Sequence, residues 1–152
     1  MVEIKKYPKN VDSMVIAKDV IGKNVIDERG TKVGTVKKLH LNPYTFYVEG
    51  ITLDNGLFRD KDFVGSEYIG SLTESGAVLL MIPITQYMGM LVYDSNGEKI
   101  GKVKDITRIK DSNNLLNITV DRGVNDGDMI INEKFIESVG ENIVLNAPVD
   151  AA

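Results

Sequence analysis

The chain has 152 residues and a formal net charge of −4, and it contains no cysteine and a single histidine, His40. The lack of cysteine excludes disulfides, iron–sulfur clusters, thiolate zinc sites and cysteine nucleophiles, and one histidine cannot build a multi-histidine metal site. Mild acidity is not typical of a general nucleic-acid binder, and no apolar run is long enough to cross a bilayer. We therefore expect a soluble, cytoplasmic protein with no nucleic-acid partner and no direct membrane insertion.

The first segment, residues 1–21, is polar and mixed in charge. We expect it to form an N-terminal extension that is partly mobile, because chain ends are poorly ordered unless something ties them down.

An internal repeat follows this extension. A shift of 67 residues aligns 22–56 with 89–123 without a gap, and 12 of the 35 pairs are identical, where unrelated segments would share about two. A weaker match continues through the next residues and, after a one-residue gap, joins 77–79 to 143–145. The sequence therefore predicts two copies of one unit, at 22–84 and 89–146, joined by a short link.

Each predicted unit consists of short strands. It opens with a hairpin, continues with a long strand (46–53 or 115–120) and a short apolar strand, and closes with one helical turn and a final strand. Many short strands with regular turn signals are typical of a barrel. We predict an all-β fold of two tandem small barrels, each of about six short strands with one short helical turn. We also expect the barrels to pack through apolar strand faces in a pseudo-twofold arrangement.

Repeated aspartates and glycines stand at the turns. Paired carboxylates are candidates for acid–base or metal chemistry, but aspartate and glycine at these spacings are explained by tight turns. Glycine inside a strand favours a bulge or a sharp bend. We interpret the set as structural, with no catalytic, cofactor or metal role: Asp27, Gly30, Gly34, Asp54, Gly56, Asp94, Gly97, Gly101, Asp121 and Gly123.

Two further features, His40 and a group of basic residues, are candidates for binding but have simpler structural explanations. His40 is expected as an exposed histidine at the end of a strand, with Thr107 as its counterpart in the second unit. Four basic residues (Lys102, Lys104, Arg108 and Lys110) share one parity and would form a stripe on a regular strand. A solvated face is the simpler interpretation, because acidic residues alternate with the basic ones.

An aromatic cluster distinguishes the first unit from the second. Tyr44, Phe46 and Tyr47 stand where the second unit has Asp111, Asn113 and Asn114. Aromatic residues at a strand start are found in cores and barrel rims as well as in contacts. We take the cluster as the candidate partner-binding site, because the two units share a framework here but not a surface.

The pattern resembles the PRC-barrel family. The motif V-x-D-x-x-G-x-x-[VI]-G-x-V occurs twice without a break, at 25–36 and 92–103. Each copy is followed by a hydrophobic strand ending in Asp-x-Gly and by a strand and short helix. Family members often have proline before that helix, where this chain has Gly65 and Asn132.

The resemblance implies a non-enzymatic adaptor without a cofactor. The family includes the cytoplasmic domain of the reaction-centre H subunit and the C-terminal domain of the ribosome maturation factor RimM. It also includes stand-alone archaeal proteins, some of which bind the membrane-anchor protein SepF in cell division. The tandem archaeal type is the closest fit, so we expect a SepF-type partner and recruitment to the division site. Homodimerisation or pairing with another PRC-barrel protein is also expected. An RNA- or ribosome-associated role like that of RimM is the alternative.

Overall fold

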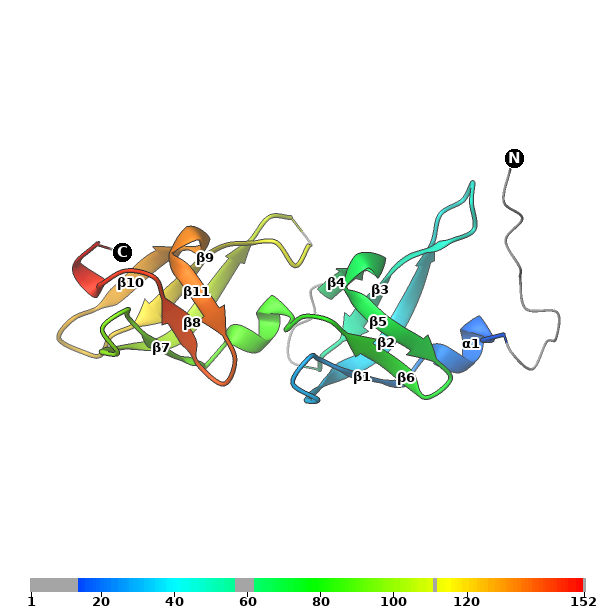
Figure 1. Cartoon of the computed structure of the whole chain (residues 1–152), viewed down its shortest axis with the longest axis horizontal. Helices are drawn as coiled ribbons and strands as arrows, with labels where there is room; N and C mark the ends of the chain where they lie inside the picture. Colours follow the sequence, from blue (N-terminus) through cyan, green and yellow to red (C-terminus); the bar gives the residue numbers. More distant parts are fainter. Residues whose placement is uncertain (1–13, 57–61, 111, 152) are drawn as a thin grey trace, which may run out of the picture.

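The computed structural model describes residues 14–56, 62–110 and 112–151 and consists of two six-stranded sheets, one per repeat (Figure 1). In the first unit a helical turn, α1 (Ala17–Val20), precedes six strands and a 3-10 turn. These are β1 (Asn24–Ile26), β2 (Lys32–Leu41), β3 (Val48–Asp54), β4 (Asp62–Gly65), η2 (Ser66–Tyr68), β5 (Ile69–Thr73) and β6 (Gly76–Leu79).

The second unit repeats this order. It comprises η3 (Ile84–Tyr87), β7 (Leu91–Tyr93), β8 (Lys99–Arg108), β9 (Leu115–Asp121), β10 (Asp128–Asn132), η4 (Glu133–Phe135), β11 (Ile136–Val139), β12 (Ile143–Leu145) and η5 (Val149–Ala151). The strand orders, β4-β3-β2-β1-β6-β5 and β10-β9-β8-β7-β12-β11, are the same. The first strand of each unit pairs in parallel with its last, and the other pairs are antiparallel. The predicted fold class of two tandem small barrels is confirmed.

Each unit has its own apolar core. β-branched residues alternate inward from the paired strands, as period-two strands require. The first core contains Val25, Val36, Ile51 and Leu79, and the second contains Val92, Val103, Ile118 and Ile143. Fully buried side chains of this kind each stabilise the fold by about 1.5–3 kcal/mol.

The repeat begins earlier than the sequence alignment suggested. The α1 turn and η3 occupy equivalent places, since Lys23 N–H donates to Val20 carbonyl as Met90 N–H does to Tyr87 carbonyl. Val20 is completely buried in the first core, so the α1 turn of the predicted extension is anchored to the first barrel through this one side chain. Residues 1–13 of that extension lie outside the described residues.

One predicted boundary is wrong. The long strand expected from residue 46 begins at Val48, because Phe46 has a φ of +63° and cannot continue a strand.

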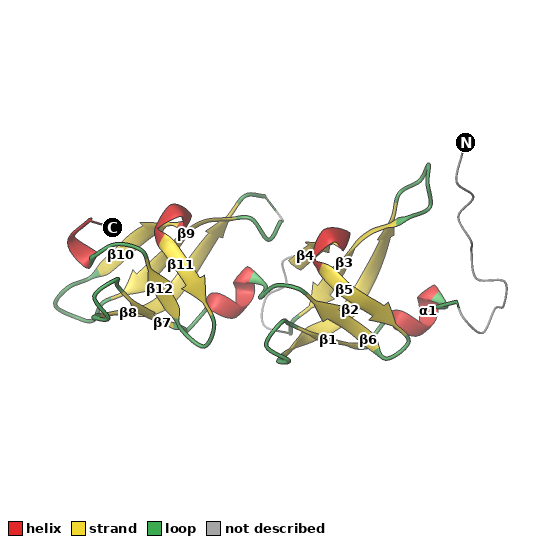
Figure 2. Cartoon of the chain, in the orientation of Figure 1, coloured by secondary structure: helices red, strands yellow, loops and turns green. Residues whose placement is uncertain are grey.

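The packing of the two barrels also differs from expectation. The hydrophobic clusters are separate, and the second unit follows the first end to end in nearly the same orientation (Figure 2). The linker between the two sheets, residues 80–90, explains this arrangement. η3 opens the second unit, yet it also follows β6 as η5 follows β12, so one segment ends one repeat and starts the next. The second barrel is therefore related to the first by a shift along the long axis, and the predicted twofold packing through apolar faces is not found.

Candidate interaction surfaces

The carboxylates of the repeated aspartates accept hydrogen bonds from nearby backbone N–H groups. Asp27 Oδ1 accepts hydrogen bonds from the Arg29 and Thr31 N–H groups at 2.8 and 3.2 Å, and Asp94 Oδ1 accepts from Asn96 and Glu98 at 2.9 and 3.0 Å. Gly30 and Gly97 close these turns with φ of +82° and +80°. Asp54 and Asp121 likewise accept from Gly56 and Gly123 N–H. All four carboxylates hold turns.

The second oxygen of Asp27 and that of Asp94 have different donors. Asp94 Oδ2 accepts from the Val149 N–H at 3.1 Å. The equivalent residue in the first unit is Pro83, which has no N–H. There the guanidinium of Arg29 donates to Asp27 Oδ2 at 2.9 and 2.6 Å instead. Burial alone would raise the pKa of Asp94, but the three N–H donors Glu98, Val149 and Asn96 lower it below its usual value.

Gly34 and Gly101 lie where two strands cross closely. A Cβ on either residue would collide with the backbone carbonyl of Asp54 or Asp121 on the neighbouring strand. Bulges accompany both glycines, since the register of β1 with β2 and of β7 with β8 shifts there. The glycines therefore permit the tight bend of each barrel.

His40 lies near the end of β2, as the sequence predicted, but it is not exposed. It is half-buried in β2, where its Nε2 lies 2.6 Å from Thr52 Oγ1 and its ring meets the Phe63 ring edge-on at 5.2 Å. This packing between β3 and β4 accounts for the histidine as a structural residue.

The four basic residues do not line one face of β8, because the strand is not regular. The register of β8 shifts between Val103 and Asp105, so the shared parity is lost. Lys104 donates to Asp128 at 2.9 Å, and this hydrogen bond raises the pKa of Lys104. Arg108 is largely buried and turns toward the first barrel.

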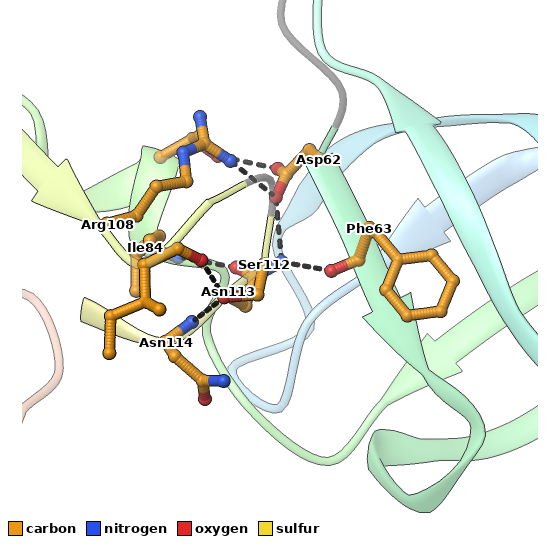
Figure 3. Close-up of polar contacts among 9 residues, drawn as sticks. Asp62, Phe63, Ile84, Arg108, Ser112, Asn113 and Asn114 are labelled. Carbon is orange, nitrogen blue, oxygen red and sulfur yellow. Dashed lines mark hydrogen bonds and ion pairs between the residues drawn. The ribbon is translucent and has the colours of Figure 1, made fainter.

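The joint between the barrels is polar and centres on Asp62 at the start of β4. Its buried carboxylate accepts from Thr85 Oγ1 and from the Asn113 side-chain amide, both at 2.8 Å, and lies 3.9 Å from the Arg108 guanidinium (Figure 3). All three partners belong to the linker or the second unit. These hydrogen bonds and the nearby guanidinium offset the free-energy cost of removing the Asp62 carboxylate from water.

Asn113 connects its own loop to β4 and to η3 by hydrogen bonds at this joint. Its amide also donates to the Phe63 carbonyl at 2.6 Å, and its carbonyl accepts from the Ile84 N–H at 3.0 Å (Figure 3). A second contact also links the two barrels: the Arg29 guanidinium donates a hydrogen bond to the Gly140 carbonyl at 3.2 Å, and we call the boundary between the barrels the seam. Sequence reasoning missed this joint. The available signal was that Asp62, Arg108 and Asn113 differ in polarity from their counterparts Met129, Leu41 and Phe46.

Two pockets lie near this seam. One of about 410 Å³ is lined by Ile84, Tyr87, Asn113 and Glu133, among others. Burial raises the pKa of Tyr87, and the nearby carboxylates Glu133 and Glu28 raise it further. The other, of about 340 Å³, lies between Arg29 and Glu141. Within the described ranges, no group of three or more acidic or histidine side chains is placed to hold a metal ion.

The aromatic cluster lies in the loop from β2 to β3. Asn42 orders this loop: its Oδ1 accepts from the Tyr44 and Thr45 N–H groups at 2.8 and 3.1 Å, and its backbone bonds to Phe46 and Tyr47. The side chains of Tyr44, Phe46 and Tyr47 are 88, 76 and 59 % exposed.

The conformation of Phe46 adds to the case for a contact. A left-handed backbone is unfavourable for a bulky residue and costs about 1–3 kcal/mol, yet it turns the Phe46 ring into solvent. The cluster is therefore neither core nor barrel rim but an ordered apolar projection at the end of the molecule away from the joint (Figure 1).

Comparison with protein-family models gives one family. The PRC-barrel domain matches twice, over residues 12–74 and 80–151. Both matches begin before the predicted units, in line with the early start of the structural repeat at α1 and η3. The search of curated proteins found no match. Among the described residues there is no helix with the length and apolar character needed to span a membrane.

Proposed function

Because the chain belongs to the PRC-barrel family, with two domains in tandem, we propose that it is a non-enzymatic adaptor that binds proteins through its barrel surfaces. PRC-barrel domains are general protein-interaction modules and are typically non-catalytic. The observation that carries the proposal is the ordered, exposed loop of Tyr44, Phe46 and Tyr47. Tyrosine and phenylalanine are enriched in the cores of protein interfaces, and tyrosine buries a large area with little loss of side-chain entropy.

The specific setting that we propose is archaeal cell division, with a SepF-type membrane-anchor protein as partner. Support comes from the resemblance of the tandem barrel to the stand-alone archaeal members of the family. A two-barrel chain suits an adaptor, because its two ends carry different surfaces: the aromatic loop at one, and the outer edge of β10 with the exposed Ile130 at the other.

An RNA- or ribosome-associated role is the alternative. It finds less support, since Lys104 is paired with Asp128 and Arg108 with Asp62, and the aromatic loop contains no basic residue. Binding to single-stranded RNA generally combines aromatic stacking with a positively charged groove.

The test is a binding titration of the purified chain against a purified SepF-type protein and, separately, single-stranded RNA at low and high salt. We expect saturable binding to the protein, weakened at least about tenfold by Phe46→Asn, since the contact would lose a buried aromatic ring. Leu80→Asn is the matched control, because Leu80 is 58 % exposed and follows β6, whereas the aromatic loop connects β2 and β3. Salt-sensitive RNA binding without protein binding would replace the proposal with its alternative.

A further inference from the structure

The joint between the barrels has an equivalent surface at each free end of the molecule. At the joint, the start of β4 meets Arg108 at the end of β8 and Asn113 in the loop that follows. The shift of 67 residues maps 108–114 onto 41–47 and maps β4 onto β10, and the strand registers agree, since Ile51 pairs with Val64 as Ile118 does with Ile131. These two equivalents lie at opposite ends of the long axis (Figure 1). Each end therefore presents the surface that the other barrel uses inside the chain.

The equivalents have changed polarity together on the two sides. At the joint, Asp62 on one side meets Arg108 and Asn113 on the other. Their counterparts are Met129 on one side and Leu41 and Phe46 on the other. The polar set at the joint therefore corresponds to an apolar set at the free ends, where Leu41 and Phe46 are exposed and Met129 is partly buried against the second core. The two end surfaces match each other in polarity, as the two sides of the joint do. Thr85 has Lys18 as its counterpart, whose stem can cover apolar surface while its ammonium stays in water.

Exposed apolar area is concentrated at these ends. The five most exposed large apolar side chains of the described residues are Val124 (103 %), Tyr44 (88 %), Phe46 (76 %), Ile130 (68 %) and Tyr47 (59 %). Tyr44, Phe46 and Tyr47 form the aromatic loop, while Ile130 lies on β10 and Val124 in the loop before it. Among the described strands β10 pairs only with β9, so its outer edge is open. Exposed apolar patches and open edges of this kind mark contacts with other chains.

We propose that a second copy of this chain binds head to tail, with the aromatic loop of one copy docked on the β10 edge of the next. The contact would reproduce between chains the arrangement that joins the barrels within one chain. Because the two surfaces differ, each copy keeps one end free, and the assembly grows as an open row rather than a closed pair. The inference rests on the proposed function in one respect, that the aromatic loop is a protein contact.

Sedimentation velocity of the full chain over a range of concentrations tests this inference. We expect the weight-average sedimentation coefficient to rise with concentration beyond that of a dimer and to persist at high salt, since the contact is apolar. Phe46→Asn at one end and Ile130→Lys at the other should each weaken association at least about tenfold. Asparagine tolerates the left-handed backbone at position 46, so that variant is expected to fold. Leu80→Asn should associate like the unmodified chain.

Mixing the two end variants gives the sharpest result. Phe46→Asn keeps an intact β10 edge and Ile130→Lys keeps an intact aromatic loop, so an equimolar mixture should form dimers and nothing larger. A chain that stays monomeric at all concentrations, or a closed dimer indifferent to both substitutions, overturns the inference. If the chain is monomeric but Phe46→Asn abolishes binding to a SepF-type protein, only the self-association fails. If Phe46→Asn changes neither, the proposed function of the loop fails as well.

Discussion

A proline in the linker explains why the two opening turns are stabilised differently. Asp94 takes a backbone N–H from Val149, and Pro83 removes the equivalent donor in the first unit. Arg29 supplies the missing donors with its guanidinium, while its counterpart Asn96 contributes only its backbone. The same arginine then reaches the Gly140 carbonyl across the seam. One residue thereby compensates for the linker proline and links the barrels.

Replacing Arg29 should therefore cost more than replacing Asn96. In Arg29→Ala the buried Asp27 carboxylate loses its side-chain donors, and we expect the free energy of unfolding to fall by about 1.5–3 kcal/mol, the range for hydrogen bonds to charged groups. Asn96→Ala at an exposed position should cost less than about 0.5 kcal/mol. Urea denaturation followed by circular dichroism measures both values. Equal losses would contradict this account of the turn.

Asp94 should give the second barrel an acid-sensitive stability. Its folded-state pKa lies below the ordinary aspartate value of about 3.9. Its contribution is therefore complete above that value and is lost as the pH falls through the folded-state pKa. Asp94→Asn should lower the melting temperature at neutral pH and flatten its decline between about pH 5 and pH 2. Glu141→Gln, at an exposed carboxylate of the same unit, serves as control and should leave the decline unchanged.

At the scale of elements, the sharp bends of the strands depend on the absence of a side chain at the bend as much as on hydrogen bonds. β2 and β8 pass so close to the ends of β3 and β9 that Gly34 and Gly101 leave no room for a Cβ. The sequence predicted the hairpins, the two glycines and the Asp-x-Gly ends, because these signals lie within a few residues of one another. It misplaced the start of β3, because the left-handed Phe46 is stabilised by the Asn42 loop rather than by its own preference.

Alanine at either glycine should disturb its barrel. The new methyl group must push two paired strands apart, so we expect Gly34→Ala and Gly101→Ala each to cost about 1–3 kcal/mol, as overpacking does. Gly140→Ala is the matched control, because a Cβ there meets nothing within 4 Å. Thermal unfolding of the three variants compares them, and a Gly140→Ala loss as large as the others would contradict the steric explanation.

At the scale of the molecule, a few polar residues join two separately packed barrels. Asp62 and Asn113 are far apart in the chain, and the repeat shows only that they differ in polarity from their counterparts Met129 and Phe46, not that they contact each other. The aromatic cluster was easier to identify from the sequence. Tyr44, Phe46 and Tyr47 stood out because they break the repeat, although only the structure shows that their loop is ordered and exposed.

Removing the Asn113 side chain should loosen the joint. Asn113→Ala takes donors from Asp62 and the Phe63 carbonyl and the acceptor from Ile84 N–H, so hydrogen exchange at Ile84 should accelerate. Stability should fall by about 1–3 kcal/mol, because buried polar groups lose their partners. Asn114→Ala, at the exposed neighbour, should leave exchange at Ile84 unchanged, and equal acceleration in both variants would contradict this role of Asn113.

At the same scale, we propose that this tandem PRC-barrel chain is a protein-interaction module that makes contact through its aromatic loop. Quantitative affinity capture from its native cells, with the unmodified chain, Phe46→Asn and Leu80→Asn as parallel baits, tests it most directly. The account predicts proteins that are retained by the unmodified chain and by Leu80→Asn but lost from Phe46→Asn. The same retained proteins with all three baits would contradict it.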